Sequence, residues 1–207
     1  MRSRTQKITV IAIIVILCVA LIGSSFYAIF LPDEDLAEDP GQQALVNEYN
    51  QWQQAVDLLN QRLAENPTDL QAKIDLGDAY YAKSEVTAQL NVDEYKEDLI
   101  NAIKMYQDVL QAKEDDNIRL KMANAAFFVG DAELASSTYE ELLANQPENP
   151  EVLFGYGMCL LYLKDDYKQA LHYWRQALPL VEDQAFKEYL QEMINLTEGM
   201  ESNSAQE

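Results

Sequence analysis

Residues 135–143 read ASSTYEELL, in which an alanine is followed four positions later by an aromatic residue and eight positions later by a leucine. A similar arrangement, with a bulky apolar or aromatic residue at the middle position, occurs four times: Ala55–Leu59–Leu63, Ala102–Tyr106–Leu110, Ala135–Tyr139–Leu143 and Ala170–Trp174–Leu178. The alanines are separated by 47, 33 and 35 residues. Repeats of this length are typical of stacked helical hairpins, because a single hairpin cannot bury its own apolar face. The pattern therefore predicts an all-α fold that binds a partner.

The segments around these alanines resemble the tetratricopeptide repeat family, which places a Leu-Gly-x-x-Tyr pattern in a first helix and a small residue followed by an aromatic residue in a second helix. The matching residues are Leu76, Gly77, Tyr80, Ala102 and Tyr106 in the first unit, Ala123, Ala126, Ala135, Tyr139 and Pro147 in the second, and Tyr156, Gly157, Leu160, Ala170 and Trp174 in the third. Ala123 and Gly157 are 34 residues apart, which is the period of the family. The resemblance covers residues 67–181 and implies a stack of about three repeats with capping helices. An ordinary helical bundle with accidental periodicity is the alternative.

The amino-terminal part of the chain predicts a membrane anchor. Ile8 to Leu31 is a stretch of 24 residues without a charge, which is enough to span about 30 Å of hydrocarbon. Arg2, Arg4 and Lys7 precede it and acidic residues follow it, so the amino terminus is expected in the cytoplasm. We expect a basic cytoplasmic terminus at 1–7, a single transmembrane helix at 8–31, an acidic linker at 32–41, an extracytoplasmic helical domain at 42–198 and a disordered tail at 199–207. The protein would therefore reside in the cell membrane.

Two other interpretations of this apolar stretch stay open. A cleaved signal peptide usually has a shorter apolar region and a small-x-small cleavage site, and residues 25–28 (SFYA) fit such a site poorly. A lipoprotein signal ending at Cys18 is the second alternative. Such signals resemble a pattern with glycine or alanine just before the cysteine, and this chain has Leu17 there.

The charge balance narrows the class of partner. All 35 acidic residues and 12 of the 15 basic residues follow Leu31, so that part of the chain carries a formal charge of −23. This charge repels phosphate backbones and disfavours nucleic-acid binding. The charge can serve solubility alone, or it can speed the capture of a basic partner.

The sequence offers no recognisable catalytic or metal-binding arrangement. Cys159 is the only cysteine after the apolar stretch and lies among Met158, Leu160 and Leu161, which predicts a buried and inert thiol. His172 is the only histidine, so a zinc site would have no second histidine ligand. We therefore expect neither enzymatic activity nor a metal or other cofactor.

The two ends of the stack and its first hairpin depart from a plain repeat. Residues 44–63 carry apolar side chains at steps of three and four, which predicts one long helix that caps the stack. About 13 extra residues around 84–98 lengthen the first hairpin, whose helices should meet near residues 91–93. This extension is either a simple protrusion or a second contact surface. A final amphipathic helix beginning near Phe186 should cover the last hairpin.

The resemblance also implies a peptide-binding groove lined by the first helix of each hairpin. The positions carried over to it include Ile74, Asp78 and Ala82. The nine residues expected to bind are Tyr81, Leu120, Asn124, Phe127, Phe128, Phe154, Met158, Leu161 and Tyr162. Members of the family that bind chaperone tails clamp a terminal carboxylate with Lys and Arg, and here only Lys73, Arg119 and Lys121 lie near those positions. We therefore expect no carboxylate clamp. The alternative is that these apolar residues are packed core.

These features together predict a membrane-anchored scaffold that binds an apolar or basic protein or peptide. The layout looks like that of bacterial proteins that assist cytochrome c maturation or accompany the protein-export channel. A chaperone-like holdase for newly exported polypeptides is the alternative. The sequence does not decide between a monomer and a larger assembly.

Overall fold

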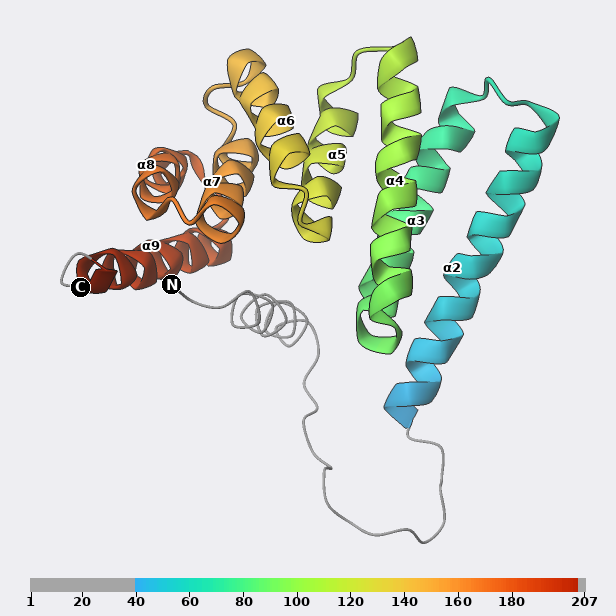
Figure 1. Ribbon diagram of the computed structural model, residues 1–207, viewed down its shortest axis with the longest axis horizontal. Helices are drawn as coiled ribbons and strands as arrows, with labels where there is room; N and C mark the ends of the chain where they lie inside the picture. Colours follow the sequence, from blue (N-terminus) through green and yellow to red (C-terminus); the bar gives the residue numbers. More distant parts are fainter. Residues whose placement is uncertain (1–39, 205–207) are drawn as a thin grey trace, which may run out of the picture. The chain divides into compact units, whose positions relative to one another are not determined.

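The structure, a computed structural model, describes residues 40–204 and the side chains of residues 40–200. Within this part of the chain every regular element is a helix, and each α-helix packs against the next in sequence (Figure 1). The elements are α2 (Pro40–Glu65), α3 (Leu70–Leu90), α4 (Val92–Ala112), α5 (Asp116–Val129), α6 (Ala132–Asn145), α7 (Pro150–Lys164), α8 (Tyr167–Ala177), the 3-10 helix η1 (Leu178–Leu180) and α9 (Gln184–Ser204). Helices α3 to α8 form three successive hairpins between α2 and α9. The predicted all-α hairpin stack with capping helices is confirmed for these residues.

The expected cytoplasmic terminus at residues 1–7 and transmembrane helix at residues 8–31 lie outside the described residues. The same is true of the linker as far as residue 39. From residue 40 to residue 204, no helix combines the length and the apolar character needed to cross a bilayer.

Two helix ends extend beyond the bounds predicted from the sequence. Helix α2 already begins at Pro40, inside the stretch expected to be linker, because the fixed φ and missing N–H of proline suit the first turn of a helix. Helix α9 continues to Ser204, past residue 199 where a disordered tail was expected. No proline interrupts residues 184–204.

The turns between helices follow from short polar side chains and one glycine. Asp69, Asp115 and Asn149 each accept a hydrogen bond from a backbone N–H in the first turn of α3, α5 and α7, which satisfies donors that lack a partner within the helix. Gly130 ends α5 with a φ of 88°, a left-handed conformation that glycine adopts without strain. Asn91 ends α3 and caps α4, so the two long helices meet where the sequence predicted.

Close helix packing depends on glycine beneath a large aromatic ring. A Cβ built on Gly77 of α3 would lie 2.6 Å from Cε1 of Tyr106, which is buried from α4. A Cβ on Gly157 of α7 would overlap the buried indole of Trp174 from α8. The repeated pairing of a small residue with an aromatic residue therefore sets the distance between the two helices of a hairpin.

Two apolar clusters hold the stack together. The larger cluster runs from Leu99 in α4 through the second and third hairpins to Ile194 in α9, so the last helix covers the end of the stack. The smaller cluster is centred on Val56 of α2 and on Leu76 and Ala79 of α3. Helix α2 is thus attached to α3 by a separate and much smaller core.

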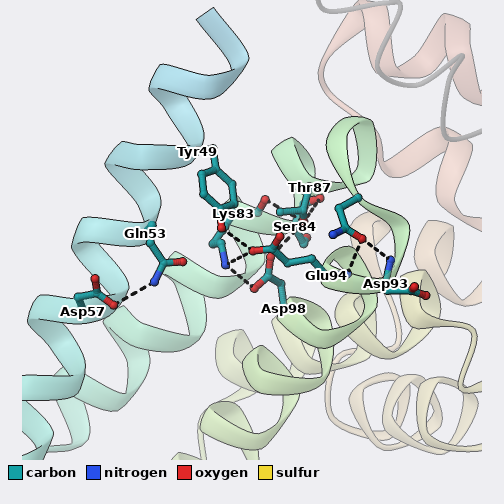
Figure 2. Close-up of polar contacts among 10 residues, drawn as sticks. Tyr49, Gln53, Asp57, Lys83, Ser84, Thr87, Asp93, Glu94 and Asp98 are labelled. Carbon is teal, nitrogen blue, oxygen red and sulfur yellow. Dashed lines mark hydrogen bonds and ion pairs between the residues drawn. The ribbon is translucent and has the colours of Figure 1, made fainter. Parts of the chain in front are cut away.

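A buried polar cluster joins the lengthened hairpin to α2 (Figure 2). The Lys83 ammonium lies 3.1 Å from Asp98 Oδ1 and 2.8 Å from Glu94 Oε1. The hydroxyl of Thr87 donates to Asp98 Oδ2 at 3.0 Å, and the hydroxyl of Tyr49 in α2 donates to Glu94 at 2.8 Å. The extra residues of the first hairpin thus form a specific joint between α2, α3 and α4.

Candidate functional site

An aromatic side chain from the second helix of each hairpin donates a hydrogen bond to the first helix. The Tyr106 hydroxyl donates to Asp78 Oδ1 at 2.8 Å, and the Tyr139 hydroxyl donates to Asn124 Oδ1 at 2.6 Å. In the third hairpin, Nε1 of Trp174 donates to the backbone oxygen of Phe154 at 3.0 Å. Burial is the main factor that raises the pKa of Tyr106 and of Tyr139, so both phenols stay protonated and act as donors near neutral pH. The hydrogen bonds from Tyr106 and Tyr139 therefore fix the orientations of the Asp78 and Asn124 side chains.

A pocket of about 260 Å³ lies between α3 and α5 and is lined by both of these residues. Its other lining residues are Tyr81, Tyr106 and Lys121. The Lys121 ammonium lies 2.8 Å from Asp78 Oδ1 and 2.6 Å from Oδ2. The pocket therefore combines a carboxylate, an ammonium and a carboxamide at a surface reached by solvent.

Four aromatic rings on α3, α5 and α7 form a continuous row next to this pocket, which we call the aromatic shelf. Tyr81 and Phe128 have ring centroids 6.3 Å apart, Phe127 and Phe128 5.3 Å apart, and Phe127 and Tyr162 6.5 Å apart. Phe128 is 42 % exposed, whereas the other three rings are half-buried. Two of the pairs meet edge-to-face and the pair of Phe127 and Tyr162 is tilted. Ring contacts of this kind stabilise one another, so the shelf is an ordered apolar surface on which one phenylalanine is exposed to solvent.

The structure divides the predicted groove residues into two groups. Tyr81, Asn124, Phe127, Phe128 and Tyr162 belong to the pocket or the shelf. The other four are Leu120, Phe154, Met158 and Leu161. They pack elsewhere, which supports the packed-core alternative for these four residues.

The four other predicted residues are covered by α9 or lie in or against the larger apolar cluster. Phe154 has its ring 5.1 Å from that of Phe186 and 6.0 Å from that of Tyr189, both on α9. Met158 and Leu161 are buried in the larger apolar cluster, and the partly buried Leu120 packs against that cluster. A helix closing the end of the stack covers the surface that a further repeat would otherwise use.

Asp78 was a groove position and Lys121 was placed near the groove, but neither was among the nine residues expected to bind, and Tyr106 and Tyr139 were assigned to the repeat pattern alone. One signal was available in the sequence, because Asp78 and Asn124 each directly follow the small residue of the repeat, Gly77 and Ala123. The equivalent positions of two units thus carry short polar side chains on the same face. The pairing of Asp78 with Lys121 joins residues 43 positions apart, and helical periodicity alone gives no information about such a pair.

The other two basic residues near the predicted groove are also paired with carboxylates. Lys73 lies 3.2 Å from Asp108 Oδ2, and Arg119 forms ion pairs with Glu114, Asp116 and Glu141. The geometry therefore agrees with the expectation that this face lacks a cluster of uncompensated positive charge.

A larger hollow of about 520 Å³ lies between α2 and α4. Its walls are mostly carboxylates and amides, including Asp57, Asp93 and Glu97, with Lys83 as the one basic residue among its described lining. Such a surface has little apolar area to bury, and apolar burial supplies most of the free energy of protein association. The smaller pocket beside the aromatic shelf is therefore the better candidate site.

Cys159 and His172 are the two residues that the sequence raised as candidates for chemistry. Cys159 is fully buried, and burial raises the pKa of its thiol to about 11. His172 is exposed on α8 and its ring contacts Gln176 and Tyr173. Among residues 40–200, no group of three His, Cys, Asp or Glu side chains is placed to hold a metal ion.

A comparison with known protein families agrees with the repeat architecture. Residues 120–185 match a family model described as tetratricopeptide repeat, and this range spans most of the second hairpin and all of the third. A solved structure described as the crystal structure of MamA is 10 % identical, with a TM-score of 0.45, and the similarity covers 83 % of this chain and 100 % of that chain. No curated protein matches the sequence.

Proposed function

We propose that this chain is a membrane-anchored scaffold that holds a segment of a partner protein on the aromatic shelf and the adjoining pocket. The observation that carries this proposal is the continuous row of rings across α3, α5 and α7, with Phe128 exposed at 42 %. Exposed aromatic residues on a rigid surface are the side chains that most often anchor a protein interface.

A protein partner fits the repeat architecture and the charge. Stacked repeats present extended surfaces for other proteins, and the second and third hairpins match tetratricopeptide repeats. A formal charge of −23 after Leu31 opposes binding of nucleic acids and of other polyanions. The shelf and the charge together favour a partner segment with large apolar side chains and a neutral or basic character.

The anchoring part of the proposal rests on the uncharged stretch of 24 residues from Ile8 to Leu31 and on the basic residues before it. A transmembrane helix there would confine the shelf to a layer beside the membrane and raise its effective concentration toward neighbouring complexes. We propose that the repeats lie outside the cytoplasm and assist the assembly of membrane or exported proteins. A reporter enzyme active only outside the cytoplasm, fused after Glu207, should be active, and an inactive but intact fusion would reverse the topology.

Site-specific cross-linking in intact membranes tests the binding surface. A photo-reactive amino acid placed at Phe128 should cross-link one dominant protein. The same amino acid at Ile100, which is 55 % exposed on α4 and outside the shelf, should not. Phe128→Glu should abolish copurification of the same partner, and Ile100→Glu should preserve it, with both variants folded by circular dichroism.

The same experiment separates the scaffold from the holdase alternative. A scaffold gives one cross-linked partner whose yield depends on Phe128. A holdase gives many unrelated products with similar yields. Equal cross-linking from Phe128 and Ile100 would contradict the proposed surface in either case.

A further inference from the structure

We propose that the tip of the first hairpin enters the surface of the lipid bilayer and gives the protein a second membrane contact. The tip consists of Leu90 at the end of α3, the connecting residue Asn91, and Val92 at the start of α4. This inference rests on the membrane anchor of the proposed function and adds an orientation to it. It also assigns a role to the extra residues that lengthen this hairpin.

The tip exposes apolar side chains where the other turns are acidic. Leu90 is 41 % exposed and Val92 is 61 % exposed. Residues 86–92 read VTAQLNV and contain no charge. Every other connection between successive α-helices from α2 to α9 contains at least one aspartate or glutamate. Turns that face water usually carry polar residues, so this tip suits an apolar surface better than it suits water.

The main-chain polar groups of the tip already have hydrogen-bond partners. The N–H of Asn91 donates to the Thr87 carbonyl oxygen at 2.7 Å, and its carbonyl oxygen accepts from the Tyr95 N–H at 2.9 Å. The side-chain oxygen of Asn91 accepts from the N–H groups of Asp93 and Glu94 at 3.1 and 3.3 Å. A polar group that leaves water with its hydrogen bonds kept inside the protein pays a small penalty. The tip can therefore enter the edge of a bilayer without losing these bonds.

The charges that follow the tip limit the depth of insertion and select the lipid. Asp93 comes directly after Val92, and Asp93 and Glu97 line the hollow between α2 and α4. A shallow position buries the two aliphatic side chains among headgroups and the first acyl carbons while the carboxylates stay hydrated. Anionic headgroups would repel these carboxylates. The lipid that fits the tip is therefore zwitterionic.

The tip lies at the end of the helices where α2 begins, after the predicted anchor (Figure 1). The hydroxyl of Tyr49 in α2 donates to Glu94, two residues beyond Val92, which places the first part of α2 beside the start of α4. Only residues 32–39 separate Pro40 from the uncharged stretch that ends at Leu31. Eight residues reach at most about 29 Å when fully extended. A tether of this length would hold this end of the hairpin near the bilayer.

A fixed connection between the tip and α2 gives the contact a consequence. The buried ammonium of Lys83 in α3 lies 3.1 Å from Asp98 Oδ1 and 2.8 Å from Glu94 Oε1 in α4, and Glu94 in turn accepts from Tyr49 (Figure 2). These contacts hold the two helices of the tip against α2. Docking of the tip would therefore set the direction of the helical stack, and of the aromatic shelf, relative to the membrane.

Quenching of a fluorophore by lipid tests this contact in the full chain. Val92→Cys is labelled with the fluorophore NBD in a chain that also carries Cys18→Ala. Cys159 is fully buried and stays unlabelled under native conditions. The protein is reconstituted in phosphatidylcholine vesicles with and without lipid that carries a nitroxide quencher near the top of its acyl chain. Ile100→Cys is the matched control, because Ile100 is 55 % exposed on the same helix and lies about 12 Å further along it.

The label at position 92 should be quenched and its emission should shift to shorter wavelength, whereas the label at position 100 should show neither effect. Adding Leu90→Asp should lower the ratio of docked to undocked tip about tenfold, because it removes apolar burial and adds a charge. Adding Ile100→Asp should leave the quenching at position 92 unchanged. Replacing part of the phosphatidylcholine by phosphatidylglycerol should weaken the quenching at low salt. Circular dichroism checks that each variant is folded.

A label on Cys18 of the otherwise unchanged chain reports on the anchor separately. If that label is quenched and the label at position 92 is not, the inference is wrong and the anchored scaffold survives. Equal quenching at positions 92 and 100 would also overturn the inference, since contact would not be specific to the tip. A label at position 92 that is unquenched in vesicles but shielded from iodide in native membranes would mean that a protein covers the tip. An unquenched label on Cys18 would contradict the anchor, and the inference would be lost with it.

Discussion

Replacing Lys83 by methionine should destabilise the protein severely, although Lys83 lies outside the proposed binding surface. Lys83 and Asp98 are 5 % and 1 % exposed, and the ammonium lies 3.1 Å from Asp98 Oδ1 (Figure 2). Without the ammonium, Asp98 would keep the hydroxyl of Thr87 as its one hydrogen-bond donor among the described side chains. Removing the cation from a buried ion pair is strongly destabilising, because it leaves a buried carboxylate whose charge is not compensated.

The expected loss follows from this geometry. Removing one partner of a buried ion pair costs about 3–5 kcal/mol. Glu94, the second carboxylate beside Lys83, is more exposed and keeps the Tyr49 hydroxyl, so its contribution is below about 1 kcal/mol. We expect a loss of about 4 kcal/mol, which lowers the melting temperature by about 8–16 °C for a domain of this size.

Thermal and urea unfolding of the full chain in detergent, followed by circular dichroism, measures this loss. Arg175→Met is the matched control, because the ion pair of Arg175 with Glu198 is about half exposed and should contribute less than about 1 kcal/mol. Adding Asp98→Asn to Lys83→Met should recover part of the loss, since the buried charge is then absent. If Lys83→Met is no more destabilising than Arg175→Met, the buried cluster does not hold the lengthened hairpin.

The pH dependence of Lys83→Met gives a second check on the same reasoning. Burial already raises the pKa of Asp98 in the wild type, and loss of the ammonium should raise it further. A carboxyl whose pKa is higher in the folded state is penalised when ionised and relieved when protonated. The deficit of the variant should therefore be largest near pH 7 and shrink as the pH falls through the raised pKa.

Three further perturbations test other parts of the structure. Gly157→Ala should lower the free energy of unfolding by about 2–4 kcal/mol in urea unfolding, because the added Cβ overlaps the Trp174 indole and disturbs both the packing and the indole hydrogen bond. Gly199→Ala is the control, since Gly199 has open space around it, and it should be neutral or slightly stabilising. Hydrogen bonds from Gln146, Asn145 and Arg119 lower the pKa of Asp116 in the folded protein. The ionised carboxylate therefore stabilises the fold above the pKa of the unfolded state, and this contribution is lost as the pH falls through the pKa of the folded state. The difference in unfolding free energy between wild type and Asp116→Asn should narrow from pH 7 toward pH 2, and a constant difference would contradict these hydrogen bonds. Cys159, with its pKa raised to about 11 and no exposed surface, should resist iodoacetamide at pH 8 until urea unfolds the chain, as read by peptide mass spectrometry, and rapid native labelling would contradict the buried position.

Repeat positions predict much of the proposed binding surface, but they do not predict where that surface ends. Tyr81, Asn124 and Phe128 occupy positions that the repeat places on the first helices, and they lie on the shelf or in the pocket. Met158 and Leu161 occupy equivalent positions and are buried. At the third hairpin, Phe186 and Tyr189 of α9 contact the ring of Phe154, and the sequence pattern does not show which groove positions are packed into the core.

The sequence by itself determined the helices, their hairpin order and most of their ends. Those features depend on local physics, namely apolar periodicity, small residues under aromatic rings, and caps such as Asp69 and Gly130. Only the tertiary structure decided that Lys121 is paired with Asp78, that Lys83 is buried against Asp98, and that α9 closes the third hairpin. These contacts join residues of different helices, so their energies depend on helix docking, which local patterns do not encode.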